Sequence, residues 1–242
     1  MSDVVTIVIG PRTRLGRALV SAAVERGEPV VAVARHAEDA AALAGSGAEI
    51  VLASDHVEPH GRRVRVLVCA LGPVHPTDPG TPVDPAADTS AVERDLAIVD
   101  RLLAAAPTAT VVLVSTVIAL APGPDRRYYG GWKNVVERAV RELAHRHRAE
   151  VAVLYPGRLV ADVSVTRPWH RLYTRYAHLA RRVEEAAAAA PRSRVVGLDA
   201  RLWLLLRGIT VALGSVTGSA GAPSAAVAQL GDPRTTSEEI TP

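Results

Sequence analysis

The chain has one cysteine, one lysine and no phenylalanine among its 242 residues. The single cysteine, Cys69, excludes an internal disulfide, and its strand-like surroundings favour a small buried residue over a nucleophile. No apolar run reaches the ~20 residues that cross a bilayer, and no basic segment precedes an apolar stretch at the N-terminus, so we expect a cytoplasmic protein with no membrane partner. The formal net charge of +3 is distributed along the chain, so we expect no nucleic-acid partner either.

The histidines form no metal-binding pattern. Asp55, His56 and His60 have no matching second cluster, and the pair His145 and His147 fits no compact zinc spacing. We therefore predict no metal site.

Apolar runs alternate with amphipathic stretches along most of the chain. With 48% hydrophobic residues, the chain can bury one large core. The alternation predicts an α/β fold, a doubly wound parallel sheet of the Rossmann type with helices on both faces. The expected strands are 4–9, 29–34, 49–53, 65–71, 110–118 and 150–155, and the expected helices are 15–26, 37–43, 91–105 and 132–144.

The turn after the first strand has a glycine at each end, at Gly10 and Gly16, and opens a helix. Glycines in this context let backbone amides approach a pyrophosphate at the positive end of the helix. The usual middle glycine is replaced by Thr13 or Arg14, depending on the register. A purely structural turn explains the motif as well.

The end of the second strand indicates which cofactor would bind. An acidic residue there would bind the ribose 2′-hydroxyl of NAD, but the strand is followed by Arg35. Together with Arg12 and Arg14 of the glycine turn, Arg35 offers guanidinium groups suited to a 2′-phosphate. This favours NADP, and a solvated arginine cluster is the alternative.

The only lysine, Lys133, lies four residues after Tyr129. Positions i and i+4 share a helix face, so we expect the ammonium group beside the tyrosine. An unperturbed tyrosine has a pKa of about 10, and a neighbouring cation would let it exchange protons closer to neutrality. The pair indicates acid/base chemistry, and a chance match with a solvated lysine is the alternative.

In order and spacing, these features resemble the short-chain dehydrogenase/reductase superfamily, nearer to its atypical and extended members, over about residues 4–160. Further residues that carry the resemblance follow the third to sixth strands; they are Asp55, Ala70, Leu71, Gly72, Ser115, Thr116, Pro156 and Gly157.

The resemblance implies a role for each of these residues. Ser115 or Thr116 would polarise the substrate oxygen, and Tyr129 would be the general acid or base. Lys133 would bind the nicotinamide ribose and lower the pKa of Tyr129. Asp55 would lie near the adenine and Pro156-Gly157 near the nicotinamide. The cofactor-binding set is Gly10, Arg12, Thr13, Arg14, Leu15, Gly16, Arg35, Asp55, Ala70, Leu71, Gly72, Tyr129, Lys133, Pro156 and Gly157.

Two positions depart from the family pattern. The middle glycine of the turn is missing, as described above. In addition, Asp95 lies near the position where many members have an asparagine that supports the lysine through water.

The chain divides into three expected parts. Residues 1–160 would form the NADP-binding core with the catalytic residues, and 161–213 a small helical substrate-binding part, with pocket candidates Trp169, His170, Tyr173 and Tyr176 on a helix over 168–188. The apolar segment 202–211 indicates a buried or interface helix. Residues 214–242 are rich in Gly, Ser, Ala, Thr and Pro, which predicts a flexible tail.

We therefore expect an NADP(H)-dependent oxidoreductase of the ketoreductase type, acting on a small organic carbonyl or secondary alcohol in a setting such as bacterial secondary metabolism. The alternatives are a sugar epimerase or dehydratase that uses the cofactor transiently, and a non-catalytic NADP-binding regulator. The expected partner is a small-molecule substrate, and a homo-oligomer is compatible with the sequence.

Overall fold

A computed structural model describes residues 3–55, 57, 62–69, 71, 85–106, 108–123, 126–161, 168–189 and 192–216. The chain separates into two compact units, Met1–Leu204 and Leu205–Pro242.

The first unit is built on a seven-stranded sheet in which every pair of neighbouring strands is parallel. The strand order is β3-β2-β1-β4-β5-β6-β9, with β1 and β4 side by side near the middle and β3 and β9 at the edges. The strands are β1 (Val4–Ile9), β2 (Val30–Ala34), β3 (Glu49–Leu52), β4 (Arg63–Val68), β5 (Thr110–Val114), β6 (Glu150–Pro156) and β9 (Arg194–Val196). The doubly wound sheet is confirmed, and β9 is an edge strand that the sequence did not predict.

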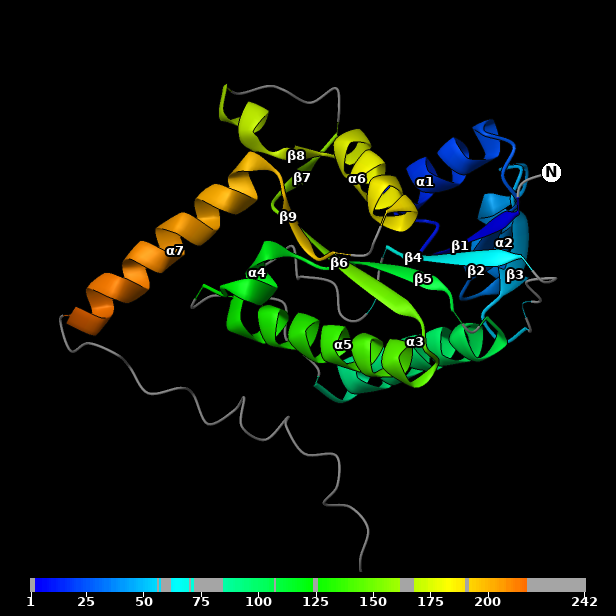
Figure 1. Cartoon of the computed structure of the whole chain (residues 1–242), viewed down its shortest axis with the longest axis horizontal. Coiled ribbons are helices and arrows are strands. Elements are labelled where there is room, and N and C mark those ends of the chain that lie inside the picture. The colour runs from blue at the N-terminus through cyan, green and yellow to red at the C-terminus, as the bar shows by residue number, and fades with distance from the viewer. Residues whose placement is uncertain are drawn as a thin grey trace, which may run out of the picture. The chain divides into compact units, whose positions relative to one another are not determined.

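Helices cover both faces of this sheet. Figure 1 shows α1 (Arg14–Glu25) and α6 (Tyr176–Ala188) on one side, and α3 (Pro85–Ala105) and α5 (Arg127–Arg146) on the other. The short helices α2 (Ala37–Leu43) and α4 (Val117–Leu120) follow β2 and β5. Successive side chains of β1 point to opposite faces of the sheet, and this places them in two separate cores. Val8 belongs to the core under α1 and α6, whereas Ile7 and Ile9 belong to the core under α3 and α5.

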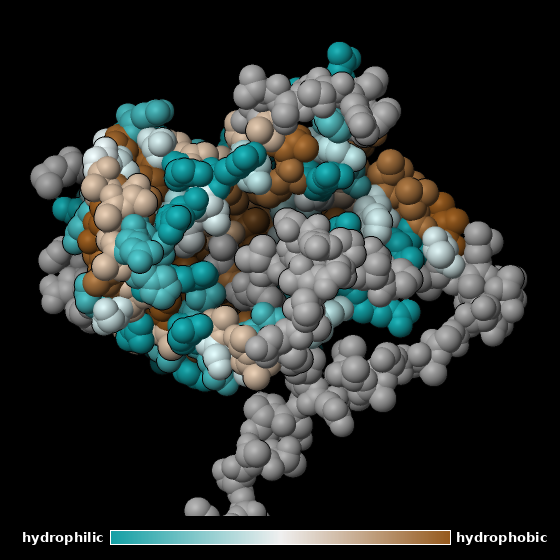
Figure 2. All heavy atoms as spheres, turned by 180° about the vertical axis from the view of Figure 1, so that it is seen from behind, coloured by the Kyte–Doolittle hydropathy of each residue, from teal (hydrophilic) through white to brown (hydrophobic). Residues whose placement is uncertain are grey.

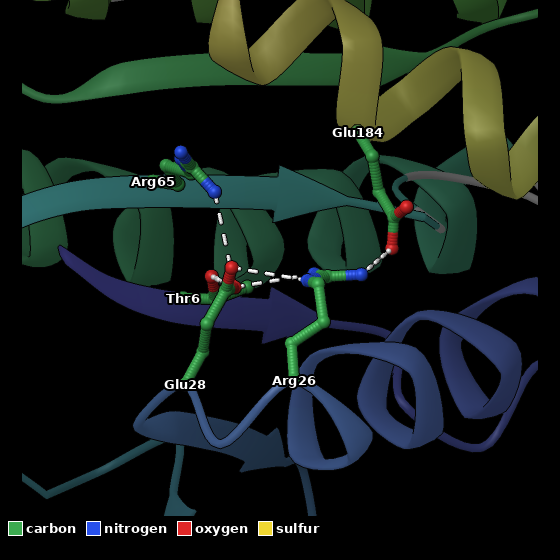
Figure 3. Close-up of polar contacts among 5 residues, drawn as sticks. All are labelled: Thr6, Arg26, Glu28, Arg65 and Glu184. Carbon is green, nitrogen blue, oxygen red and sulfur yellow. Dashed lines mark hydrogen bonds and ion pairs between the residues drawn. The ribbon is translucent and has the colours of Figure 1, made fainter. Parts of the chain in front are cut away.

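A charged network joins the layer of α1 and α6 to the sheet (Figure 3). Arg26, at the end of α1, donates hydrogen bonds to Glu28 over 3.0 and 3.1 Å and to Glu184 of α6 over 2.7 Å. Glu28 also accepts a 3.5 Å hydrogen bond from Thr6 of β1 and lies 3.8 Å from Arg65 of β4. Because Arg26 holds the ionised carboxylate, the pKa of Glu28 is lowered. The network therefore links α6 to α1, β1 and β4.

The segment after β6 differs from the expected helix over 168–188, which is wrong in its first half. Pro168–Leu172 is a 3-10 turn (η2), Thr174–Arg175 is a strand (β8) that pairs with β7 (Leu159–Val160), and α6 begins only at Tyr176. The cause is tertiary, because buried Thr174 donates hydrogen bonds to Val196 O over 3.2 Å and to Asp199 over 3.1 Å.

The last helix, α7 (Leu198–Val216), has exposed apolar side chains. They lie at intervals of about one turn and are Leu198, Leu202, Leu205, Leu206 and Ile209; Figure 2 shows apolar side chains of this helix in brown. The sequence predicted a buried or interface helix over 202–211, and this stays a prediction. None of the helices in the described ranges has the length and apolar character needed to cross a membrane.

Candidate functional site

The predicted site residues lie where the strands of the sheet end. Gly10 follows β1, Arg35 follows β2, Leu71 comes shortly after β4, Ser115 follows β5 and Gly157 follows β6. The carboxyl ends of parallel strands share one edge, and the strand order reverses between β1 and β4. Ligands of doubly wound sheets bind at such a switch point.

The glycine turn at this edge is closed by Thr13. Gly10 has a φ of 78°, which favours glycine, and its carbonyl accepts hydrogen bonds from the Thr13 amide over 3.1 Å and the Thr13 hydroxyl over 2.9 Å. The same hydroxyl accepts a 2.9 Å hydrogen bond from the Gly16 amide and so caps α1. A threonine at the place of the missing middle glycine therefore stabilises the start of the helix.

The helix lies against this turn so closely that Gly16 has no room for a side chain. A Cβ there would approach the carbonyl oxygen of Gly10 and come within 2.8 Å of the Cα of Pro11. Leu15 is buried in the core, and Arg14 is exposed at the first position of α1. Leu15 therefore offers a ligand its backbone alone. The tight turn at the positive end of a 12-residue helix is the arrangement that accepts a phosphate group.

Tyr129 and Lys133 share a face of α5, as the spacing predicted. Lys133 Nζ lies 5.3 Å from the centroid of the Tyr129 ring, within the range of a cation–π contact. It also donates a 2.6 Å hydrogen bond to the carbonyl oxygen of Leu71. The ammonium group is thus fixed between α5 and the segment after β4, at the edge where the glycine turn lies.

Burial changes the proton affinity of both groups. It raises the pKa of Tyr129 above its ordinary value of 10, and the Arg126 guanidinium opposes this increase. It lowers the pKa of Lys133 to about 8, where Asp95 acts to raise the value and Arg35 to lower it further. The resemblance implied a lowered tyrosine pKa, whereas in the structure desolvation of the phenol dominates. Near neutral pH, Tyr129 holds its proton and most of Lys133 is charged.

The neighbouring tyrosine has a different environment. Tyr128 donates a 2.7 Å hydrogen bond from its hydroxyl to Asp88 of α3 and packs edge-on against the buried Trp132. Tyr128 therefore joins α5 to α3 and forms a natural control for Tyr129.

Two hydroxyl groups follow β5. The Ser115 hydroxyl oxygen is buried and has no hydrogen-bond partner within the described part of the chain, while the Ser115 amide donates to Leu154 O over 2.9 Å. Thr116 caps α4, because its hydroxyl accepts a 3.4 Å hydrogen bond from the Ile118 amide, which leaves its own proton to donate. Both residues remain candidates for binding the substrate oxygen.

Two of the three arginines predicted to bind a 2′-phosphate, Arg12 and Arg35, are paired with carboxylates. Arg35 donates a 2.8 Å hydrogen bond to Asp95, which is 5% exposed, and Arg12 forms an ion pair with Asp39. Asp95 therefore contacts the guanidinium after β2 and also raises the pKa of the lysine on α5. The ion pair of Arg35 with Asp95 joins residues 60 positions apart and was not predicted from the sequence.

A cavity of about 430 Å³ opens beside Arg35. It lies at the carboxyl ends of β2 and β3 against α3, and Arg94 and Arg101 of α3 also line it. Arg101 donates a hydrogen bond to Ala53 O after β3, and Arg94 donates one to Ser90 O within its own helix over 3.2 Å. Neither arginine was predicted as a site residue, although their seven-residue spacing on a predicted helix indicates that they share a face.

The predicted cofactor-binding residues after β3 and β4 have different surroundings. Asp55 accepts hydrogen bonds from the Leu52 amide over 3.3 Å and the Ser54 hydroxyl over 3.1 Å, so its carboxylate stabilises the turn after β3. Leu71 is buried and contributes its carbonyl to Lys133. Ala70 and Gly72 lie outside the described residues.

Pro156 ends β6, and Gly157 is packed against a carboxylate. A Cβ on Gly157 would collide with Asp199, which accepts a 2.6 Å hydrogen bond from the Arg158 amide. The second carboxylate oxygen of Asp199 accepts the hydrogen bond from Thr174. Asp199 thus holds the segment after β6 in place, a role that the sequence analysis did not identify.

Aromatic residues lie beyond this segment. The His170 and Tyr173 rings are stacked with centroids 5.5 Å apart, and the Arg158 guanidinium lies 5.2 Å from the Tyr173 centroid. Tyr176 is half-buried at the start of α6, and the side chain of Trp169 lies outside the described residues.

Two other sequence predictions concern metals and the cysteine. In the described ranges, no group of three or more His, Cys, Asp or Glu residues could hold a metal ion, and His147 forms a 2.7 Å contact with Asp100. His56 and His60 lie outside those ranges. Desolvation raises the pKa of Cys69 to about 12, which agrees with an unreactive thiol.

Comparisons with known proteins give the fold. No protein-family model matches the sequence, and no curated protein matches it. Among solved structures, the chain is similar to a short-chain dehydrogenase from Burkholderia cenocepacia in complex with NADP (TM-score 0.61, 18% identity, covering 92% of this chain and 100% of that one). It is also similar to a 3-oxoacyl-[acyl-carrier protein] reductase with bound NAD from Brucella melitensis (0.57, 18%, 82% and 91%) and to the anaerobillin reductase ChuY from Escherichia coli O157:H7 (0.57, 16%, 81% and 97%). The chain therefore has the fold of the short-chain dehydrogenases/reductases, which confirms the architecture that the sequence resemblance implied.

Proposed function

We propose that this protein is an NADP(H)-dependent oxidoreductase of the ketoreductase type, which reduces a small organic carbonyl compound. The observation that carries the proposal is the position of the only lysine. Lys133 Nζ is bonded to Leu71 O at the switch point of the sheet and lies over the ring of Tyr129. Burial also lowers the pKa of Lys133 to about 8, and ionisable groups with perturbed pKa values gather at functional sites.

The residues at the site fit a dinucleotide. The tight turn at Gly10 and Gly16 would hold the pyrophosphate at the start of α1, and the cavity beside Arg35 would hold the adenosine end. Lys133 would bind the nicotinamide ribose. Bound NADPH would supply the hydride. The similar structures that contain NADP and NAD support a nicotinamide cofactor.

Tyr129 would donate the proton to the substrate oxygen. Because burial raises the pKa of its phenol, Tyr129 is protonated at neutral pH, the form that a general acid needs in a carbonyl reduction. Ser115 or Thr116 would hold the same oxygen by a hydrogen bond. The half-buried position of Tyr129 would limit access of water to the phenol.

The preference for NADP over NAD would come from the arginines of the cavity. Arg94 and Arg101 line it beside Arg35, and guanidinium groups bind phosphate by paired hydrogen bonds. Asp95 competes with a 2′-phosphate for Arg35, so the phosphate has to replace this ion pair or bind the other two arginines.

Titration of the protein with NADPH and NADH tests the cofactor. We expect NADPH to bind at least about tenfold more tightly, a difference of about 1.4 kcal/mol. Arg35→Asp and Arg94→Gln should each reduce this preference, whereas Arg127→Gln, an exposed change on α5 outside the cavity, should not. Equal affinities, or tighter binding of NADH, would refute the NADP assignment. A screen of carbonyl substrates for NADPH consumption then identifies the substrate class.

A further inference from the structure

A second large cavity lies on the other side of the sheet. Its volume is about 560 Å³, and it is formed by the edge strand β9, helix α6 and the first turn of α7. Its lining includes Leu154 and Val196, which belong to the core under α1 and α6, whereas Tyr129 and Lys133 lie on α5 against the opposite face (Figure 1). None of its lining residues belongs to the predicted cofactor or catalytic set.

The charged groups that line this cavity are all basic. Among the residues that the structure describes, three arginines, Arg182, Arg194 and Arg201, line it together with His178, and no carboxylate does. Arg182 is paired with Glu185 over 2.7 Å. Within the described ranges, Arg194 and Arg201 have neither an ion pair nor a side-chain hydrogen bond. Glu185 also interacts electrostatically with Arg194, so the guanidinium group of Arg201 is fully available to a ligand and that of Arg194 is shared with this carboxylate.

The acidic residue nearest in sequence does not neutralise them. Asp199 is in the first turn of α7, but one of its oxygens accepts a hydrogen bond from the Arg158 amide and the other from the Thr174 hydroxyl. Gly197 and Leu198, at the amino end of the 19-residue helix α7, also line the cavity. The helix end adds positive potential to that of the arginines.

His178 provides a neutral hydrogen-bond donor. Its Nδ1 lies 3.1 Å from a guanidinium nitrogen of Arg181, which can only donate, so the ring proton is on Nε2. Burial and the neighbouring arginines lower the pKa of His178, which is consistent with a neutral ring. The arginines and this imidazole lie beside apolar side chains of β6 and β9, including Leu154 and Val195.

We propose that this cavity is a second binding site, for an organic phosphate monoester with an apolar portion. Arginine binds a phosphate dianion by paired, charge-assisted hydrogen bonds, and the apolar wall suits the remainder of such a molecule. The volume lies within the range of about 300–1,000 Å³ that is typical of small-molecule sites. The proposal does not depend on the cofactor or on the reaction at Tyr129.

Isothermal titration calorimetry of the full chain with phenyl phosphate tests the site. We expect phenyl phosphate to bind at least tenfold more tightly than benzoate, which has one charge, and phenol to give no measurable binding. The double variant Arg194→Gln/Arg201→Gln should bind phenyl phosphate at least tenfold more weakly than the unmodified protein, and Arg201→Gln alone should show a smaller loss of affinity. Arg192→Gln is the matched control, because Arg192 is exposed and close in sequence but outside the lining.

Arg35→Gln separates this cavity from the proposed cofactor site. We expect this variant to bind phenyl phosphate like the unmodified protein. Loss of binding in Arg35→Gln with retention in Arg194→Gln/Arg201→Gln would place the phosphate in the cavity beside β2 and overturn the proposal. Absence of binding, or equal binding of benzoate and phenyl phosphate, would overturn it as well. The single variant Arg201→Gln keeps the comparison intact if the double variant does not fold.

Discussion

Raising the pH from 7 to 9 should weaken NADPH binding through Lys133 alone. The lysine has a pKa of about 8, so it is mostly charged at pH 7 and mostly neutral at pH 9. If only the ammonium form binds the ribose, the apparent dissociation constant grows in proportion to one plus the ratio of neutral to charged lysine. The expected increase is about tenfold between these two pH values, or about 1.4 kcal/mol.

The groups around Lys133 set the pH at which it loses its charge. Asp95 raises the Lys133 pKa, so Asp95→Asn should move the loss of affinity to lower pH. Tyr129 has a pKa above 10 and stays protonated throughout the range. The 2′-phosphate of NADPH is a monoester with a second pKa of about 6, and the pyrophosphate has no second ionisation, so the charge of the ligand changes little above pH 7.

Fluorescence titration with NADPH at pH 7, 8 and 9 and constant ionic strength measures the effect. Lys133→Met should bind more weakly at pH 7 and show no dependence on pH in this range. An affinity of the unmodified protein that is independent of pH would refute the reasoning, as would a Lys133→Met variant that keeps the full dependence.

Three further changes test other parts of the structure. Gly16→Ala forces a Cβ against the backbone of Gly10, which should cost about 1–3 kcal/mol of stability and lower the melting temperature by several degrees. The same change should weaken NADPH binding. An unchanged melting temperature would contradict the close packing. Glu28→Gln should cost about 1 kcal/mol near pH 7 in urea unfolding. The pKa of Glu28 is lowered in the folded state, so ionised Glu28 stabilises the fold at pH values above its ordinary pKa of 4.5. The difference in unfolding free energy between the unmodified protein and Glu28→Gln should therefore shrink as the pH falls below that value. A difference that is constant with pH would contradict the stabilising role of the ionised carboxylate. Of Ser115→Ala and Thr116→Val, the one that removes the group bound to the substrate oxygen should lower turnover at least about tenfold, and full activity in both would exclude a role for either hydroxyl.

The parts of the fold that the sequence predicted depend on local patterns. The predicted strands are short and largely apolar, and Tyr129 and Lys133 meet because residues four apart on a helix are neighbours. The threonine in the glycine turn is also a local effect, since Thr13 caps the helix that follows it.

The parts that it missed depend on contacts between distant segments. β9 has only three residues and exists because it pairs with β6, and Thr174 is extended because it bonds to Val196 and Asp199. In the same way, the partner of Arg35 is Asp95, on a helix that follows two further strands. Such pairings are decided by the packed sheet, and no periodicity in the sequence reports them.

The proposed mechanism depends on Tyr129 as the proton donor, and the adjacent Tyr128 allows a direct test of this role. The measurement is the rate of NADPH oxidation with an accepted carbonyl compound for Tyr129→Phe and Tyr128→Phe, with NADPH affinity determined for each. Tyr129→Phe should lower turnover about 100-fold or more and leave the NADPH affinity nearly unchanged, because only the proton donor is lost. Tyr128→Phe removes the hydrogen bond to Asp88 and should keep most of the turnover. Undiminished turnover in Tyr129→Phe, or an equal loss in both variants, would contradict the account.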